Sequence, residues 1–265
     1  MQVIGEKING TRKRVAQAIA ARDAEFIQGL AKKQTDAGAA WLDVNAGTML
    51  SQEPQDLVWL IETIQAAVDT PLCLDSANPR ALEAGIAVVH QTPMINSISG
   101  EPARLQGILP IVVAHGCPVI ALAMDDRGIP KRPADRMAVI RELMRRTREQ
   151  GIADQRVYID PLAMTISTNV QSANITLETM RFVRAEFPEA HLTLGLSNIS
   201  FGLPARARIN RTFMVLAMEA GLDSAIIDPM DREMRAVIIT TTTLLGRDRH
   251  CLNYTRAYRA GLLDS

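Results

Sequence analysis

The feature that most limits how this chain can fold is an alternation, running from one end to the other, of short aliphatic runs and longer stretches of helical periodicity. Such alternation is typical of βα units that build a parallel sheet. Eight strands are predicted, at 2–6, 40–45, 71–76, 93–99, 118–125, 156–161, 192–198 and 224–229. Eight helices are predicted between and after them, at 24–37, 54–68, 79–90, 102–115, 133–150, 173–187, 208–220 and 231–246.

Eight such units in 265 residues predict an α/β fold in which the sheet closes into a (β/α)8 TIM barrel, because that fold typically needs about 250 residues. No Gly-, Ser- or Pro-rich linker divides the chain, so residues 1–265 are predicted to form a single domain. The alternative is a doubly wound open sheet, which normally carries a G-x-G-x-x-G turn after its first strand. This chain has GEKING (5–10) there, which favours the barrel.

Charge and composition exclude several classes of function. The 29 basic and 29 acidic side chains leave no net charge, and the low aromatic content of 4% leaves little for base stacking, so no nucleic-acid partner is predicted. The most apolar window, 110–124, is interrupted by a histidine, a glycine and a proline, so no membrane span is predicted. The opening residues carry charges before any apolar stretch, which argues against a secretory signal. Three widely spaced cysteines without a C-x-x-C pair predict reduced thiols in a cytoplasmic protein: Cys73, Cys117 and Cys251.

Polar side chains close the predicted strands. In a barrel the carboxyl ends of the strands meet at one mouth, where such folds carry their chemistry. The residues at or next to these ends are all carboxylates or amides: Glu6, Asp43, Asn45, Asp75, Asn96, Asp125, Asp126, Asp160, Asn198 and Asp228. Asp and Asn are also common turn residues and helix caps. Four of them directly follow apolar strand residues, which predicts side chains that point into the mouth: Asp75, Asn96, Asp160 and Asn198.

A ring of carboxylates and amides suits two kinds of ligand. One is a divalent metal ion with a carboxylated substrate, held by several Asp oxygens. The other is a flat heterocycle with an amino group beside a ring N–H, because one carboxylate accepts both donors side by side. Lys7 is the one lysine at a strand end, which argues against a Schiff-base aldolase. A histidine-rich metal site is not predicted, because all four histidines precede strands or end helices: His90, His115, His191 and His250.

Six motifs are more specific than these strand ends. They are IGEKING (4–10), LCLDS (72–76), MINS (94–97), YIDPL (158–162), LGLSNISFGLP (194–204) and INRTF (209–213). In this order, over essentially the whole chain, they resemble the pterin-binding methyltransferases that use methyltetrahydrofolate and a corrinoid protein. The resemblance implies a (β/α)8 barrel, a homodimer, and methyl transfer between the pterin nitrogen and the cobalt of a separate corrinoid protein. Tetrahydrofolate or 5-methyltetrahydrofolate is then the substrate. Cobalamin is expected only on the partner, because the chain has no D-x-H-x-x-G sequence.

The same resemblance implies roles for individual residues. It implies that one set holds the pterin ring and lines its pocket: Asp75, Asn96, Asp160, Gly195 and Ser197. Arg206 is expected to approach the folate from the loop after the seventh strand. Asn198 matches the family asparagine that hydrogen-bonds the methyl-bearing nitrogen, and it is the predicted catalytic residue. An amide cannot be the acid, but it can bond that nitrogen differently in the substrate and in the transition state. No metal ligand is predicted.

Three alternatives stay open. Dihydropteroate synthase, another pterin barrel, is expected to open with an Asn-Val-Thr-Pro-like loop and to place basic residues at its last strand, whereas this chain has GEKING and IIDP (226–229) there. A folate-binding protein without turnover is disfavoured by the presence of Asn198. A magnesium-dependent lyase would lose activity with a chelator. The FGLP stretch (201–204) resembles the folate module of methionine synthase and leaves the corrinoid partner unidentified. The direction of methyl transfer is also open.

Overall fold

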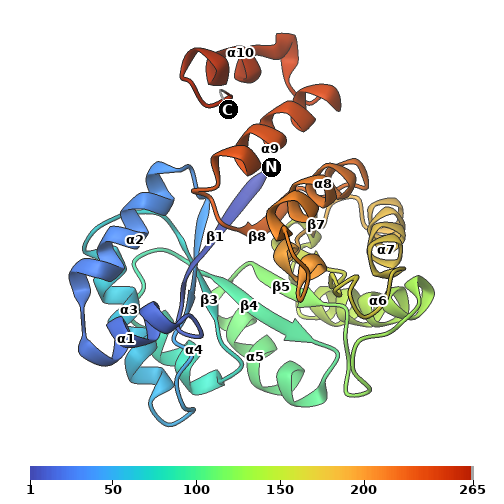
Figure 1. Ribbon diagram of the computed structural model, residues 1–265. Coiled ribbons are helices and arrows are strands. Elements are labelled where there is room, and N and C mark those ends of the chain that lie inside the picture. Colours follow the sequence, from blue (N-terminus) through green and yellow to red (C-terminus); the bar gives the residue numbers. More distant parts are fainter. Residues whose placement is uncertain (264–265) are drawn as a thin grey trace.

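The computed structural model describes residues 1–263, and within them eight parallel strands form one sheet that curls into a barrel (Figure 1). Hydrogen-bonded neighbours follow the order β7-β6-β5-β4-β3-β2-β1-β8. The predicted (β/α)8 TIM barrel is therefore confirmed. The strands are β1 (Gln2–Asn9), β2 (Trp41–Asn45), β3 (Leu72–Asp75), β4 (Met94–Ser99), β5 (Val119–Leu122), β6 (Val157–Asp160), β7 (His191–Leu192) and β8 (Ser224–Ile227).

All eight predicted helices are present on the outside of the sheet. They are α2 (Ala24–Asp36), α3 (Glu53–Gln65), α4 (Pro79–Ile86), α5 (Pro102–His115), α6 (Pro133–Glu149), α7 (Ser172–Glu186), α8 (Arg206–Glu219) and α9 (Arg232–Leu244). The limits of α5 agree with the prediction because Pro102 occupies its first turn and Gly116, with φ 60°, ends it. Two further helices were not predicted, α1 (Lys13–Ala21) and α10 (Leu252–Arg259).

The seventh strand is much shorter than predicted. Only His191–Leu192 pair as β7, and part of the predicted strand 192–198 instead forms the 3-10 helix η2 (Leu196–Ser200). Leu192, Leu194 and Leu196 are all buried, as their alternation with other residues predicts. The regular strand pairing nevertheless ends at Leu192. The barrel still closes, because the Ile226 N–H donates to the Leu194 carbonyl at 2.8 Å and Gly195 bridges to Ile226.

Side chains alternate between the interior of the barrel and the layer under the helices. The interior cluster consists of Ile4, Cys73, Met94, Ile120 and Tyr158, with three partly buried neighbours. Residues two positions further along a strand face the same side. This rule places three predicted site residues on the inner face at the carboxyl ends of their strands: Asp75 after Cys73, Asn96 after Met94, and Asp160 after Tyr158.

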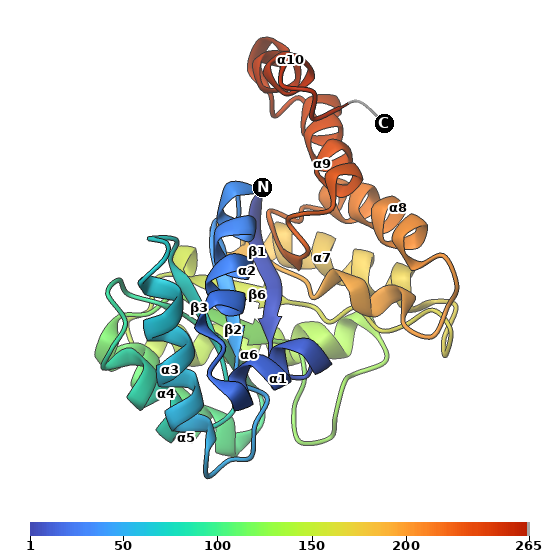
Figure 2. The ribbon, with the colours of Figure 1, turned by 60° about the vertical axis from the view of Figure 1, so that its left-hand side comes forward.

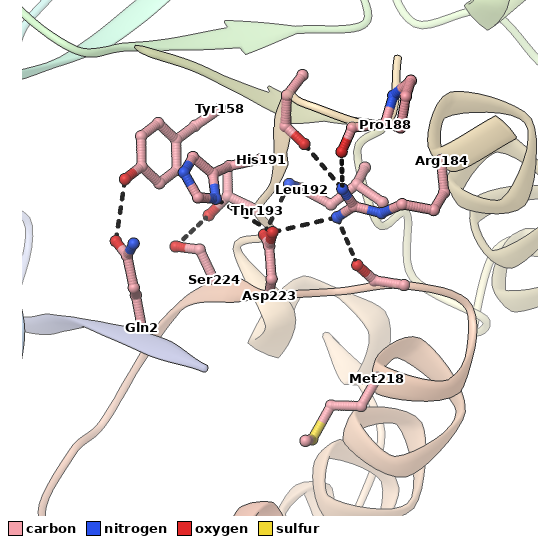
Figure 3. Close-up of polar contacts among 12 residues, drawn as sticks. Gln2, Tyr158, Arg184, Pro188, His191, Leu192, Thr193, Met218, Asp223 and Ser224 are labelled. Atoms are coloured by element: carbon pink, nitrogen blue, oxygen red, sulfur yellow. Dashed lines mark hydrogen bonds and ion pairs between the residues drawn. The ribbon is translucent and has the colours of Figure 1, made fainter. Parts of the chain in front are cut away.

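A polar cluster closes the opposite end of the barrel (Figure 3). The Tyr158 ring stacks on His191 with 4.4 Å between centroids, and its hydroxyl donates to the Gln2 side chain at 3.0 Å. Asp223 accepts from the Leu192 N–H at 2.9 Å and lies 3.2 Å from Arg184, whose guanidinium also donates to the Gly221 carbonyl at 2.7 Å. These side chains join β7 to the segment before β8, where the ladder is short.

The last two helices form an arm that projects from the barrel (Figure 2). Its outer helix, α10, lies at the end where β1 begins, on the side away from the mouth. Ala257 is the buried residue of α10, whereas Leu244 at the end of α9 is 80% exposed and Leu252 and Tyr258 are also exposed. Within residues 1–263, no helix has the length and apolarity needed to cross a bilayer.

Candidate active site

Asp160 lies deepest among the predicted binding residues. It ends β6 with 6% of its surface exposed. Its Oδ1 accepts the Leu162 N–H at 2.7 Å, and its Oδ2 faces the Gly195 N–H at 3.4 Å. Burial raises the pKa of Asp160 to about 6, although both N–H groups and the charge of Arg136 act in the opposite direction. A carboxylate held in this way keeps lone pairs for further N–H donors.

Asp75 ends β3 and is half-buried at the same rim. Its Oδ2 accepts the Asn45 side-chain amide at 2.9 Å. Burial raises the pKa of Asp75 as well. In the part of the chain that the structure describes, the Asn45 Oδ1 is buried and has no hydrogen-bond partner. Asn45 therefore orients Asp75 and offers one more acceptor atom.

Asn96 lies beside Asp75, because the two residues are partners in the β3–β4 register. Its side-chain amide donates to Asp43 Oδ1 at 3.2 Å, which leaves the Asn96 oxygen as the atom available to a ligand. Asp43 is 3% exposed, and its burial together with the charge of Asp75 raises the pKa of Asp43 well above its ordinary value. The pKa of both carboxyl groups is therefore raised, that of Asp43 more strongly.

Asp43 and Asn45 lie at predicted strand ends, but no binding or catalytic role is predicted for them from the sequence. Their spacing from Trp41 is the sequence signal that could have placed both side chains at the site. Both lie an even number of positions after Trp41, which packs in the barrel interior, so the period of two places all three on the inner face. Asp43 supports Asn96, and Asn45 supports Asp75.

Asn198 is not at a strand end as predicted. It lies on η2 and is exposed. The reason is that the backbone turns into η2 at Gly195, with the Asn198 N–H bonded to the Gly195 carbonyl at 3.2 Å. Its side chain folds back over Gly195, since a Cβ added there would meet the Asn198 Nδ2 at 3.1 Å. The Gly195 N–H faces Asp160, so the Asn198 amide and the Asp160 carboxylate both lie beside Gly195.

Arg206 also differs from its predicted place. It is the first residue of α8 rather than part of a loop, because the helix begins two residues earlier than predicted. Its guanidinium donates to the Ser197 carbonyl at 2.7 Å and to the Ser200 hydroxyl at 3.0 Å. Arg206 therefore holds η2, and with it Asn198, against the start of α8.

A cavity of 370 Å³ adjoins η2 between β1 and α8. It is lined by Glu6, Arg12, Ser197, Arg206, Ala207, Asn210, Ile227, Asp228, Asp231 and Met234. It therefore continues the mouth beyond Ser197 and Arg206. A larger cavity of 640 Å³ lies at the other end, beside Arg184 and Asp223. This second cavity lies away from the rim residues and is not part of the site. The Arg184 guanidinium that lines it donates to the Ala190 and Gly221 carbonyls. Among residues 1–263, no group of three His, Cys, Asp or Glu side chains is arranged to hold a metal ion.

The geometry thus brings carboxylate and amide side chains from four strands, β2, β3, β4 and β6, to one rim, with the Asn198 amide beside Gly195. The chain belongs to the pterin-binding enzymes, because the model of that family matches residues 5–228. This range includes every predicted site residue. The family resemblance seen in the sequence motifs is confirmed.

Among individual relatives, the chain is 38% identical to the methylcorrinoid:tetrahydrofolate methyltransferase of Eubacterium limosum over 263 residues, which cover 98% of this chain and 97% of that protein. It is 32% identical to the methionine synthase of Mycobacterium tuberculosis over 248 residues, covering 87% of this chain and 21% of that protein.

Solved structures show the same fold. A dihydropteroate synthase from Coxiella burnetii in complex with pteroic acid superposes with a TM-score of 0.66 at 19% identity, covering 91% of this chain and 93% of that one. The dihydropteroate synthase from Xanthomonas albilineans in complex with 7,8-dihydropteroate also gives 0.66 at 19% identity, covering 94% of this chain and 93% of that one.

Proposed function

We propose that this chain is a methyltransferase that moves a methyl group between the cobalt of a separate corrinoid protein and the pterin nitrogen of tetrahydrofolate. The observation that carries the proposal is the match over nearly the whole length of both proteins to the E. limosum methylcorrinoid:tetrahydrofolate methyltransferase. That relative's name also favours one direction, from the methylated corrinoid to tetrahydrofolate. Residues 1–265 are proposed to act as one pterin-binding unit.

The pterin ring is proposed to bind by the edge that carries its amino group and ring N–H. Asp160 and Asp75 accept these donors, and Asn96 offers its side-chain oxygen. The support is that these atoms lie on one inner rim and are backed by fixed partners, Asp43 behind Asn96 and Asn45 behind Asp75. Hydrogen bonds between N–H groups and a buried carboxylate are stronger than neutral ones. The backbone around Gly195 and Ser197 lines the same space.

In the transfer step, the lone pair of the pterin nitrogen forms a bond to the methyl carbon. The bond from that carbon to cobalt breaks, and both of its electrons stay on cobalt, which passes from Co(III) to Co(I). The nitrogen gains positive charge and then loses its proton to water. Asn198 is proposed to bond this nitrogen through its amide oxygen as the charge develops, which stabilises the transition state more than the substrate. In the reverse direction the amide reorients.

We also propose a cytoplasmic homodimer that meets the corrinoid protein at the barrel mouth. An isolated helix of the length of α10 is marginal in water, and α10 buries little against its own barrel, so a second copy that covers the arm would stabilise it. The outer helix of the arm, α10, lies away from the mouth, which leaves the mouth accessible to the proposed corrinoid protein. Unpaired cysteines fit a reducing compartment.

The experiment that tests the proposal mixes the protein with tetrahydrofolate and methylcobalamin, and then with methylated corrinoid proteins. The expected result is loss of methylcobalamin absorbance matched by formation of 5-methyltetrahydrofolate. Binding of tetrahydrofolate without turnover with every corrinoid donor would support a binding protein instead. Condensation of a pterin diphosphate with an aminobenzoate would support a dihydropteroate synthase. Equilibrium sedimentation of the full chain tests the dimer.

A further inference from the structure

Arg136 on α6 is a buried arginine with an unusual set of partners. It is 2% exposed and is among the largest fully buried side chains described. Its Nε donates to the Pro130 carbonyl at 3.0 Å, and its Nη1 donates to the carbonyls of Pro161 and Leu162 at 2.6 and 2.7 Å. Within residues 1–263, the salt bridges do not include Arg136. Its buried positive charge is therefore held by neutral oxygens.

These contacts fall on the segment that directly follows Asp160. Leu162 has a positive φ of 65°, a conformation that is uncommon for a residue with a Cβ. In this conformation its N–H donates to Asp160 Oδ1 at 2.7 Å. Arg136 bonds the carbonyls of Leu162 and of the residue before it, so it fixes the turn that supplies this donor.

The charges of the two side chains also act on each other. Burial lowers the pKa of Arg136, and the negative charge of Asp160 opposes this change. The charge of Arg136 likewise lowers the pKa of Asp160 against the effect of burial. The other groups that act on Asp160 are the uncharged N–H groups of Leu162 and Gly195, and its register partner on β5 is Leu122. Arg136 is thus the charged group of the described chain that bears on Asp160.

We propose that Arg136 is a positioning residue for pterin binding, which holds the turn after Asp160 and supplies a buried positive charge that favours the carboxylate form of Asp160. The proposal rests on the proposed role of Asp160 in binding the ring. A purely structural role would need only the bonds to the carbonyls, whereas this role also needs the positive charge.

The test compares Arg136→Met, which removes the charge, with Arg136→Lys, which keeps it but loses the planar set of donors. The matched control is Arg184→Met, because Arg184 also bonds several carbonyls, at the other end of the barrel (Figure 3). Two quantities are measured on each full-length variant. One is the titration of Asp160 without ligand, by NMR of carbon-13-labelled carboxyl groups, and the other is the Kd for tetrahydrofolate at pH 6 and pH 8.

For Arg136→Met we expect the pKa of Asp160 to rise by about one unit, the lower end of what a neighbouring charge does. Starting from a pKa of about 6, this leaves about one tenth of Asp160 ionised at pH 6 instead of one half, so the Kd at pH 6 rises about fivefold. The ionised fraction hardly changes at pH 8, so the part of the loss due to ionisation disappears there. Arg136→Lys should keep the titration near that of the wild type.

An Asp160 titration that is unchanged in Arg136→Met, or shifted equally in Arg184→Met, would overturn the proposal. If Arg136→Met does not fold, the lysine variant decides the question, because a large upward shift of the Asp160 pKa with the charge retained would also overturn the proposal. The titration needs no ligand. A wild-type protein that shows the expected titration but does not bind tetrahydrofolate would therefore refute the proposed function and not the effect of Arg136 on Asp160.

Discussion

Replacing Asp160 with Asn is expected to stabilise the fold while it weakens pterin binding. Burial raises the pKa of Asp160 from its ordinary value of 3.8 to about 6. A rise of this size means that the ionised side chain costs about 3 kcal/mol of folding free energy at pH 7.5. Asparagine removes this cost. It also turns an N–H group toward the Gly195 N–H, which costs about 1 kcal/mol. The net gain is about 2 kcal/mol, or about 4 °C in Tm for a chain of this size.

The pH dependence distinguishes this account from a general packing effect. A carboxyl group whose pKa is raised on folding stabilises the protein in its protonated form below the unfolded-state pKa, and this contribution is lost as the pH rises through the folded-state value. The cost in the wild type therefore falls from about 3 kcal/mol at pH 7.5 to about 1 kcal/mol at pH 4.5. The advantage of Asp160→Asn should shrink to near zero over the same range.

The assay is urea unfolding of both proteins at pH 7.5 and pH 4.5, followed by circular dichroism. The matched control is Asp69→Asn, an exposed aspartate before β3 at the other end of the barrel, which is expected to change stability by less than about 0.5 kcal/mol. In parallel, the Kd for tetrahydrofolate should rise about ten- to a hundredfold, because asparagine cannot accept two N–H donors side by side. A variant that is less stable than the wild type at pH 7.5 would refute the reasoning.

Three further predictions concern the same rim. Asn198→Ala should slow methyl transfer about ten- to a thousandfold while the Kd for tetrahydrofolate changes by a small factor; equal losses in both would show a binding residue only. Asp75→Ala should instead raise the Kd for tetrahydrofolate about ten- to a hundredfold, measured by isothermal titration calorimetry. An unchanged Kd would show that Asp75 acts only as a turn residue. In the wild type the pKa of Asp160 is about 6, so the affinity for tetrahydrofolate should be constant above pH 6 and fall about tenfold per unit below it. A flat profile would contradict a role for ionised Asp160.

The fold could be predicted from the sequence because the strongest signals are local. Pro102 and Gly116 mark the ends of α5. Each strand is marked by side chains that alternate between the barrel interior and the layer under the helices. The short β7 could not be predicted in the same way. Leu192, Leu194 and Leu196 are buried whether the backbone is in a ladder or in a 3-10 turn, so apolar alternation does not report where backbone hydrogen bonds go.

Two helices were missed for different physical reasons. In α1 the buried residues Val15, Ala18 and Ile19 have helical spacing, but the helix is short and follows a basic, polar stretch. In α10 only Ala257 is buried, so no apolar face toward the barrel marks the helix. The prediction that side chains directly after apolar strand residues point into the mouth agrees with the inner-face positions of Asp75, Asn96 and Asp160. Their binding role, and that of Asn198, stay predictions.

The early end of β7 determines the depth at which each part of the site lies. Because the paired part of β7 ends at Leu192 and the chain turns into η2 beside α8 and β8, Asn198 is exposed while Asp160 is buried. A pterin ring bound by its inner edge, as proposed, would therefore turn its outer edge toward solvent. The proposed corrinoid partner would then reach that edge from above the opening, and the proposed transfer needs no hinge in the barrel.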